Sequence, residues 1–236
     1  MRPLRSVVPV VCVVAMFAVA SAADETYTLK QPFKVGSTEK NTVSVKLDLP
    51  TTGIIDVTFD AASTVTAVHE DGGASIDSSQ TNLVVKQGDT ILSQQPSTPK
   101  ETTVVDKVGR LISTTAEPSL QKSIFIVTRA AGIVDAGHAV AVAESWKVHY
   151  DKLDDKGLAE GDAEYKLNKV TTDGAHKVAS IEWTYTDKGD DATSAKGTAD
   201  VFLDSGELKS AKIEVDNFPT QTGNAKHATI TILHKD

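Results

Sequence analysis

Histidines and carboxylates are the side chains of this sequence with the widest chemistry, because they bind metals and transfer protons. The six histidines stand far apart along the chain: His69, His138, His149, His176, His227 and His234. No H-E-x-x-H motif contains any of them, and the last two, seven residues apart, would face opposite sides of a regular strand. We therefore predict solvated surface histidines and no metal site, with a zinc site assembled from distant His and Asp residues as the alternative.

Acidic pairs mark two polar stretches, at Asp154-Asp155 and Asp190-Asp191. Loop carboxylates bind calcium, but neither pair has the D-x-[DN]-x-[DN]-G spacing of a calcium loop, so solvated hairpin tips are favoured. The sequence also lacks a G-x-S-x-G motif, a phosphate-binding glycine loop and a lysine-centred serine motif. We predict no catalytic residue and no cofactor. A hydrolase with a site dispersed over distant strands stays open, because catalytic triads are defined by geometry.

Five aromatic residues of the C-terminal half are the candidate ligand-binding residues: Trp146, Tyr150, Tyr165, Trp183 and Tyr185. Each stands at an inward-facing position of a segment in which apolar and polar residues alternate. Large aromatic side chains at such positions usually form the core. They also line pockets for sugars or lipids, so a ligand-binding role is the alternative that we carry forward.

The first residues have the organisation of a secretory signal peptide. Arg2 and Arg5 form a basic start, residues 7–19 are almost wholly apolar, and Ala20-Ser21-Ala22 is an A-x-A cleavage site. We predict cleavage after Ala22 and export to the periplasm or beyond. We also predict no integral membrane span in the mature chain, because the apolar run over residues 7–19 is shorter than the ~20 residues that cross a bilayer. The single cysteine, Cys12, would leave with the signal, which removes disulfides and thiolate chemistry.

The mature chain would be strongly acidic. Loss of Arg2 and Arg5 leaves 22 of the 24 basic residues against 32 acidic ones, a net charge of −10. Nucleic acid and anionic lipid surfaces bind to basic patches, and the sequence has no cluster of Lys and Arg interleaved with aromatics. We therefore predict no nucleic-acid partner and interpret the acidity as a source of solubility.

The elements that must position the aromatic residues are strands. Apolar and polar residues alternate over residues 42–49, 179–185 and 199–203, as in strands with one buried face. Asp204-Ser205-Gly206 separates the last of these from another alternating run, and a glycine there suits a tight hairpin. We predict an all-β fold of antiparallel meander strands that form curved sheets, and not a doubly wound α/β fold.

Three stretches interrupt the alternating pattern. Residues 94–101 and residues 217–224 both contain proline, so both are predicted to be connections. Residues 120–127 fit either a strand or a short helix, because the spacing of their apolar residues does not decide between the two.

The chain is predicted to be an internal duplication. Gly109 and Gly206 occupy matching positions in two similar hairpins, and Ala74-Ser75-Ile76 recurs as Ala179-Ser180-Ile181. Two hairpin sets that share only composition are the alternative. The predicted organisation is a signal peptide over residues 1–22, a first β repeat over 23–116, a linker over 117–138 and a second β repeat over 139–236.

A resemblance to known proteins rests on the second repeat. Val142-Ala-Glu-Ser-Trp146 follows an irregular segment and precedes two Thr/Tyr-rich strands and a Leu-Asp-Ser-Gly-Glu-Leu hairpin. This order resembles uncharacterised families of exported bacterial β-proteins, which carry a V-G-D-S-W motif and a D-x-x-T-G-x-L hairpin. The chain departs from the motif at Ala143, which replaces Gly, and at Glu144, which replaces Asp. The resemblance implies an exported all-β protein and no particular activity.

Three classes of function follow. We adopt an exported, non-catalytic β-sheet protein that is a binding module or acts in the cell envelope, with an apolar small molecule or an envelope component as partner. The second class is a carrier of a hydrophobic ligand, which a hollow inward face would favour. The third is the hydrolase, which a convergent histidine, carboxylate and hydroxyl would favour. No pattern in the sequence predicts an oligomeric state.

Overall fold

The computed structural model describes residues 25–29, 32–189, 192–220 and 223–235 of the 236-residue chain. The predicted signal peptide and the Asp190-Asp191 pair lie outside these residues. The elements within them are β1 (Thr26–Tyr27), β2 (Thr38–Leu49), β3 (Gly53–Val68), β4 (Ala74–Gln87), β5 (Thr90–Ser97), β6 (Glu101–Val105), β7 (Leu111–Thr114), α1 (Pro118–Ala131), β8 (Val140–Ala141), β9 (Ser145–Tyr150), the 3-10 turn η1 (Asp154–Lys156), β10 (Gly161–Asp173), β11 (His176–Asp187), β12 (Ser194–Phe202), β13 (Leu208–Thr220) and β14 (Gly223–His234).

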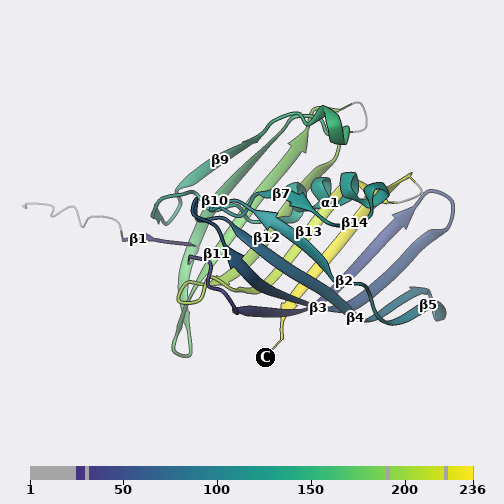
Figure 1. The fold of residues 1–236 in the computed structure, drawn as a ribbon, viewed down its shortest axis with the longest axis horizontal. Helices are drawn as coiled ribbons and strands as arrows, with labels where there is room; N and C mark the ends of the chain where they lie inside the picture. The colour runs from purple at the N-terminus through teal and green to yellow at the C-terminus, as the bar shows by residue number, and fades with distance from the viewer. Residues whose placement is uncertain (1–24, 30–31, 190–191, 221–222, 236) are drawn as a thin grey trace, which may run out of the picture.

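One curved sheet contains all of the long strands (Figure 1). Its order is β7-β6-β4-β3-β2-β14-β13-β12-β11-β10-β9, with β5 paired to β4 beside this path, while β1 pairs with β8 separately. All of these pairs are antiparallel, which confirms the predicted all-β fold. The last strand, β14, pairs with β2, so the two predicted repeats meet within one sheet. Both halves follow a meander, and the internal duplication and the domain boundaries stay predictions.

The strands are longer than the alternating runs indicated. The loop predicted over residues 94–101 is too long, because β5 continues through Pro96 to Ser97 and only residues 98–100 separate it from β6. The connection predicted over residues 217–224 is also too long, since β13 continues to Thr220 and pairs there with β14. Pro96 and Pro219 lie where their strands have a neighbour on one side only, so the missing N–H breaks no ladder.

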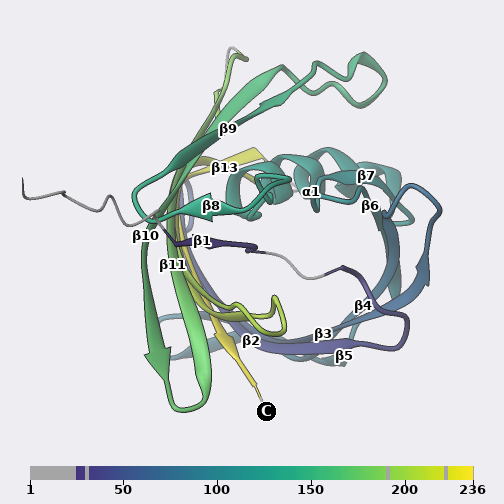
Figure 2. The same ribbon diagram turned by 90° about the vertical axis from the view of Figure 1, so that its left-hand side faces the viewer.

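The segment that fitted either a strand or a helix is helix α1. Pro118 stands at its start, where the absent N–H costs nothing, and the helix ends before Gly132, whose N–H donates to the Thr128 carbonyl. The helix buries Phe125, Ile126 and Ala130 on one face. Figure 2 shows α1 inside the curve of the sheet, where it contacts β11–β13 on one side and β7 on the other.

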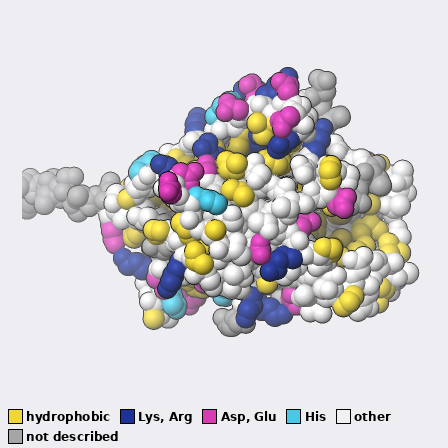
Figure 3. Space-filling view, in the orientation of Figure 1, with side chains coloured by type: hydrophobic (Ala, Val, Ile, Leu, Met, Phe, Trp, Pro, Cys, Tyr) yellow, Lys and Arg dark blue, Asp and Glu magenta, His cyan; other side chains and the backbone are white. Residues whose placement is uncertain are grey.

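The two halves of the sheet are covered unequally. The inward residues of β10–β13 are buried, whereas most of those of β2–β4 are only partly buried and every residue of β5 is exposed. Ile54, Ile91 and Leu92 are large exposed apolar residues of this first half. Figure 3 shows hydrophobic side chains in a hollow at the β2–β5 end of the molecule, and further groups of them elsewhere on this face. The helix therefore closes one half of the concave face and leaves the other half open.

Three aromatic residues in one cross-strand row join the sheet to the chain that follows α1. Trp146, Tyr165 and Trp183 face each other on β9, β10 and β11, and their rings stack with centroids 5.4 and 6.2 Å apart. Each ring also donates one hydrogen bond of 2.9 Å to a backbone carbonyl: Trp183 to Ala130, Tyr165 to Gly132 and Trp146 to Val134. We call these three residues the aromatic ladder.

The aromatic ladder ends at a glycine. Gly197 of β12 is the cross-strand partner of Trp183, and a Cβ atom at this glycine would lie 2.1 Å from the indole ring. Trp183 is 2% exposed, which confirms the expectation that it belongs to the core. The missing side chain at Gly197 is therefore what lets the indole lie flat on β12.

We predict that Gly197→Ala lowers the free energy of unfolding by about 1–3 kcal/mol, because the new methyl group overpacks the site and displaces the indole of Trp183. Urea titration followed by Trp fluorescence measures the change. Gly189→Ala is the matched control, since a Cβ there lies 3.4 Å from its nearest neighbour. Equal stabilities of the two variants would contradict the close packing of Trp183 on β12.

Candidate functional site

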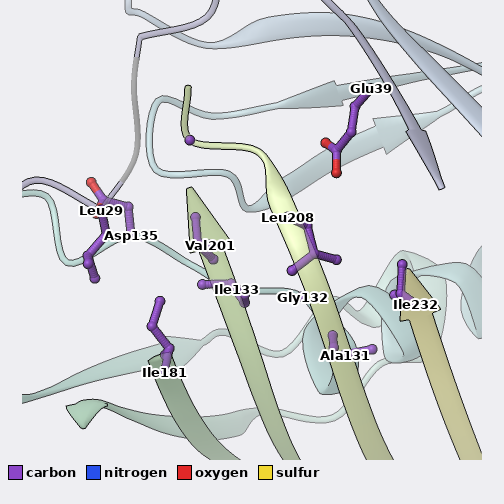
Figure 4. Close-up of a pocket in the computed structure, with 12 residues that line it drawn as sticks. Leu29, Glu39, Ala131, Gly132, Ile133, Asp135, Ile181, Val201, Leu208 and Ile232 are labelled. Carbon is purple, nitrogen blue, oxygen red and sulfur yellow. The ribbon is translucent and has the colours of Figure 1, made fainter. Parts of the chain in front are cut away.

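A pocket of about 280 Å³ lies between the concave face of the sheet and the chain after α1 (Figure 4). The sheet forms its floor with Ile181 of β11, Val201 of β12 and Ile232 of β14. Ala131, Gly132, Ile133 and Asp135 form its roof, and Leu29, Glu39, Gly206, Leu208 and Ala211 complete the lining. A cavity of ~150 Å³ holds one benzene ring, so this pocket has room for a larger apolar group.

Small side chains in the sheet make the floor hollow. Ile181, Ala199, Ala211 and Ile232 are successive partners in one cross-strand row, so two alanines stand between two isoleucines. A β-bulge at Lys209 shifts the register, with the result that Leu208 and Ala211 both line the pocket although they are three residues apart. The floor is thus apolar and recessed at its centre.

The aromatic ladder sets the position of the roof. Its three hydrogen bonds hold the carbonyls of Ala130, Gly132 and Val134 against β9–β11, and the roof residues Ile133 and Asp135 alternate with these positions. The helix end is also tied down from its other side, because the buried Arg129 donates to the Asp151 and Ala159 carbonyls at 2.9 Å. The roof therefore depends on contacts outside the pocket.

Of the residues that the structure describes, two carboxylates are the only ionisable groups in the lining. Glu39 receives a 3.0 Å hydrogen bond from the Asn41 amide, and Figure 4 shows its carboxylate pointing toward Leu208. Asp135 accepts the Gly137 N–H at Oδ2, whereas its Oδ1 atom is buried without a hydrogen-bond partner. Among the described residues, neither carboxylate forms an ion pair with Lys, Arg or His. The pocket thus combines apolar walls with uncompensated negative charge.

A second pocket of about 340 Å³ adjoins the first, since both are lined by Glu39 and Gly206. Phe33, Val65 and Ile76 contribute apolar surface to it. It carries one lysine, Lys34, and a further carboxylate, Glu207. The concave space therefore continues from the covered half of the sheet toward β2–β4.

The five predicted ligand-binding residues are all buried. The aromatic ladder lies beneath the roof segment, and none of its side chains lines the 280 Å³ pocket. Tyr150 and Tyr185 meet edge to face at 5.9 Å, and the Arg129 guanidinium stands 5.0 Å above the Tyr150 ring. Burial raises the pKa of Tyr185 to about 12, which keeps its phenol neutral. A direct binding role for the five stays a prediction.

The residues that form the pocket carry no motif. Ile181, Val201, Ala211 and Ile232 follow from the alternating pattern as inward residues, but nothing in the sequence separates a lining residue from a core residue. The roof is harder still to predict from the sequence, because residues 117–138 have the composition of a linker. Two alanines in adjacent strands are the one sequence signal that, with the register known, marks a recess.

Four histidines contact acidic side chains on the surface. His149, His176 and His227 each contact an aspartate at 2.6–2.8 Å, and His138 contacts Glu144 at 3.2 Å. His149 also lies 3.7 Å from Asp151. His69 contacts a hydroxyl instead, that of Ser75, at 3.1 Å. None of these five histidines joins a carboxylate with a hydroxyl, the arrangement that a hydrolytic triad requires. In the part of the chain that the structure describes, no three His, Cys, Asp or Glu residues lie close enough to hold a metal ion.

The resembled motif forms the turn into β9. Ala143 has a φ of +70°, and its N–H donates to the Leu167 carbonyl at 2.7 Å. Glu144 accepts the Ala141 N–H at 2.8 Å, and this bond with that of His138 lowers the pKa of the Glu144 carboxyl. The glycine of the V-G-D-S-W motif thus corresponds to a left-handed position, where alanine is strained.

Comparison with known proteins yields only distant structural likenesses. No family model matches the chain, and no curated protein sequence matches it. An exported protein with a YmcC-like fold from Bacteroides fragilis is 9% identical, with a TM-score of 0.32 over 89% of this chain and 100% of the other. A lipoprotein from Parabacteroides distasonis is 9% identical, with a TM-score of 0.33 and the same two coverages.

A third similar structure is DynF from the dynemicin biosynthesis pathway of Micromonospora chersina. It is 8% identical, with a TM-score of 0.24 over 99% of this chain and 92% of the other. At these TM-scores the three likenesses establish neither a family nor a function. The features from which a function can be argued are the curved antiparallel sheet and the apolar pocket at the end of α1. In the described residues, no helix is both long and apolar enough to span a membrane.

We predict that Ala143→Gly raises the free energy of unfolding by about 0.5–1 kcal/mol, because relief of the left-handed strain exceeds the added chain entropy. Urea titration measures the change. Ala139→Gly, in the loop before β8, is the control and should be neutral or slightly destabilising, since that alanine has no positive φ. A destabilised Ala143→Gly variant would contradict the turn geometry.

Proposed function

We propose that this protein is an exported, non-catalytic binding module that takes up an apolar small molecule under the C-terminal end of α1. The pocket of about 280 Å³ carries this proposal. Export is supported by the signal-like sequence at residues 1–22. The proposal unites the two non-catalytic classes that the sequence left open, a binding module and a carrier of a hydrophobic ligand.

Two features of the lining support an apolar occupant. Ile181, Val201 and Ala211 are almost fully buried at the floor, so an occupant would contact packed hydrocarbon. Leu208 and Ile232 are only partly buried in the free protein and would lose more of their exposed surface to an occupant. Burial of apolar area stabilises a complex by roughly 25 cal/mol per Å², so these two side chains favour binding.

A catalytic role has less support. No described histidine lines the pocket with these carboxylates, and the His–carboxylate pairs lie on the exposed surface. General acid–base catalysis needs its groups within hydrogen-bond reach of the reacting atoms. We therefore favour uptake of the apolar molecule without a chemical step.

We predict that the neutral dye N-phenyl-1-naphthylamine increases in fluorescence on binding to the protein. Ala211→Leu should weaken binding by at least about tenfold, because added methylene groups fill the recess and each is worth ~1–3 kcal/mol in a fitted pocket. Lys212→Leu is the matched control, since it adds the same side chain to the opposite face of β13. Unchanged dye binding by Ala211→Leu, or none by the unaltered protein, would overturn the proposal.

A further inference from the structure

The charges around the pocket indicate the polar part of its occupant. Glu39 and Asp135 are the ionisable residues of the first pocket, and Lys34 and Glu207 join Glu39 in the adjoining one. Within the described part of the chain, the two adjoining pockets therefore have three carboxylates and one lysine in their lining. A site with this balance repels an anionic group and attracts a cationic one.

The two carboxylates would act on an occupant in different ways. The Oδ1 atom of Asp135 accepts no hydrogen bond but is shielded from solvent, so this carboxylate would act on an occupant through its charge. Glu39 receives one hydrogen bond, from Asn41, at Oε1. Glu39 can thus accept a hydrogen bond from an occupant, whereas, among the described residues, no Lys, Arg or His lines the pocket to donate one to an anion.

The position of Glu39 fits the head of an amphipathic molecule. Its carboxylate points toward the apolar side chain of Leu208, at the place where the two pockets meet (Figure 4). An occupant with its hydrocarbon on Ile181, Ala211 and Ile232 would extend from the recessed floor toward this carboxylate. Apolar walls that end at an acceptor suit a chain that ends in a donor.

We propose that the pocket selects cationic amphiphiles, molecules in which an apolar chain or ring carries an ammonium group. This inference rests on the proposed binding function and adds the sign of the ligand's charge. Glu39 and Asp135 are the positions that confer the preference, because both carboxylates attract an ammonium group and Glu39 can also accept a hydrogen bond from it. A matched carboxylate would place like charges together and bind more weakly.

The test compares three ligands with the same chain: decylamine, decanol and decanoate, below their micelle-forming concentrations at pH 7. Each competes with N-phenyl-1-naphthylamine for the unaltered protein. Decylamine should bind roughly tenfold or more tightly than decanol, as expected for hydrogen bonds to a charged group, and decanoate should bind most weakly. In the variant that combines Glu39→Gln with Asp135→Asn, decylamine should fall to the affinity of decanol, while decanol itself is unchanged.

Asp48→Asn is the matched control, because it removes one negative charge from the exposed face of the same strand, β2. It should leave all three affinities as they were. If the double variant does not fold, salt titration of the unaltered protein replaces it. Raising the ionic strength from ~0.01 to ~1 M should then reduce the advantage of decylamine over decanol by screening the charges.

The outcomes separate this inference from the proposed function. Displacement of the dye by all three ligands with equal affinity, or most strongly by decanoate, would overturn the cationic preference and leave the apolar pocket in place. A decylamine preference that survives the double variant or high salt would overturn the assignment to Glu39 and Asp135. Failure of the dye and of every ligand to bind would overturn both proposals.

Discussion

Three hydrogen bonds from aromatic side chains to backbone carbonyls hold the end of α1 and the roof segment against the concave face of the sheet. The Ala130 carbonyl lies in the last turn of α1, where carbonyls have no partner within the helix, and the Trp183 indole supplies the missing donor. Gly132 is extended after the helix, and its carbonyl is bound by Tyr165 two residues further on. Without these donors the carbonyls would be buried and unsatisfied, which is costly. The sheet therefore specifies where the helix ends and where the next segment runs.

The rest of the concave face follows from this attachment. Stacked rings on three neighbouring strands fill the space below the roof at the β9–β11 side, and Gly197 gives Trp183 the room it needs on β12. In the neighbouring cross-strand row, the small residues Ala199 and Ala211 lie between Ile181 and Ile232, and the side chains no longer fill the space below the roof. The pocket thus lies where the large aromatic residues stop but the roof continues. This arrangement explains why the predicted aromatic residues are buried yet do not line the pocket.

The sequence predicted the fold class because period-two alternation reports directly on burial. Ala179, Ile181, Trp183 and Tyr185 are all inward and buried, as their spacing indicated. The sequence does not predict the features that depend on tertiary context. Pro96 is tolerated because β5 lies at an edge, and α1 includes residues 120–127, whose apolar spacing fits both a strand and a helix. The pocket needs the register of four strands and a roof from a distant segment. No local pattern contains that information.

Hydrogen exchange of the roof amides is the most direct measurement of the central claim, that ring-to-carbonyl hydrogen bonds hold the roof on the sheet. Tyr165→Phe keeps the stacked ring and removes only the hydroxyl that binds the Gly132 carbonyl. Tyr185→Phe is the control, because it removes a buried hydroxyl for which no hydrogen bond to a roof carbonyl is found. The account predicts faster exchange across residues 130–135 in Tyr165→Phe and not in the control. Equal exchange in both variants would contradict it.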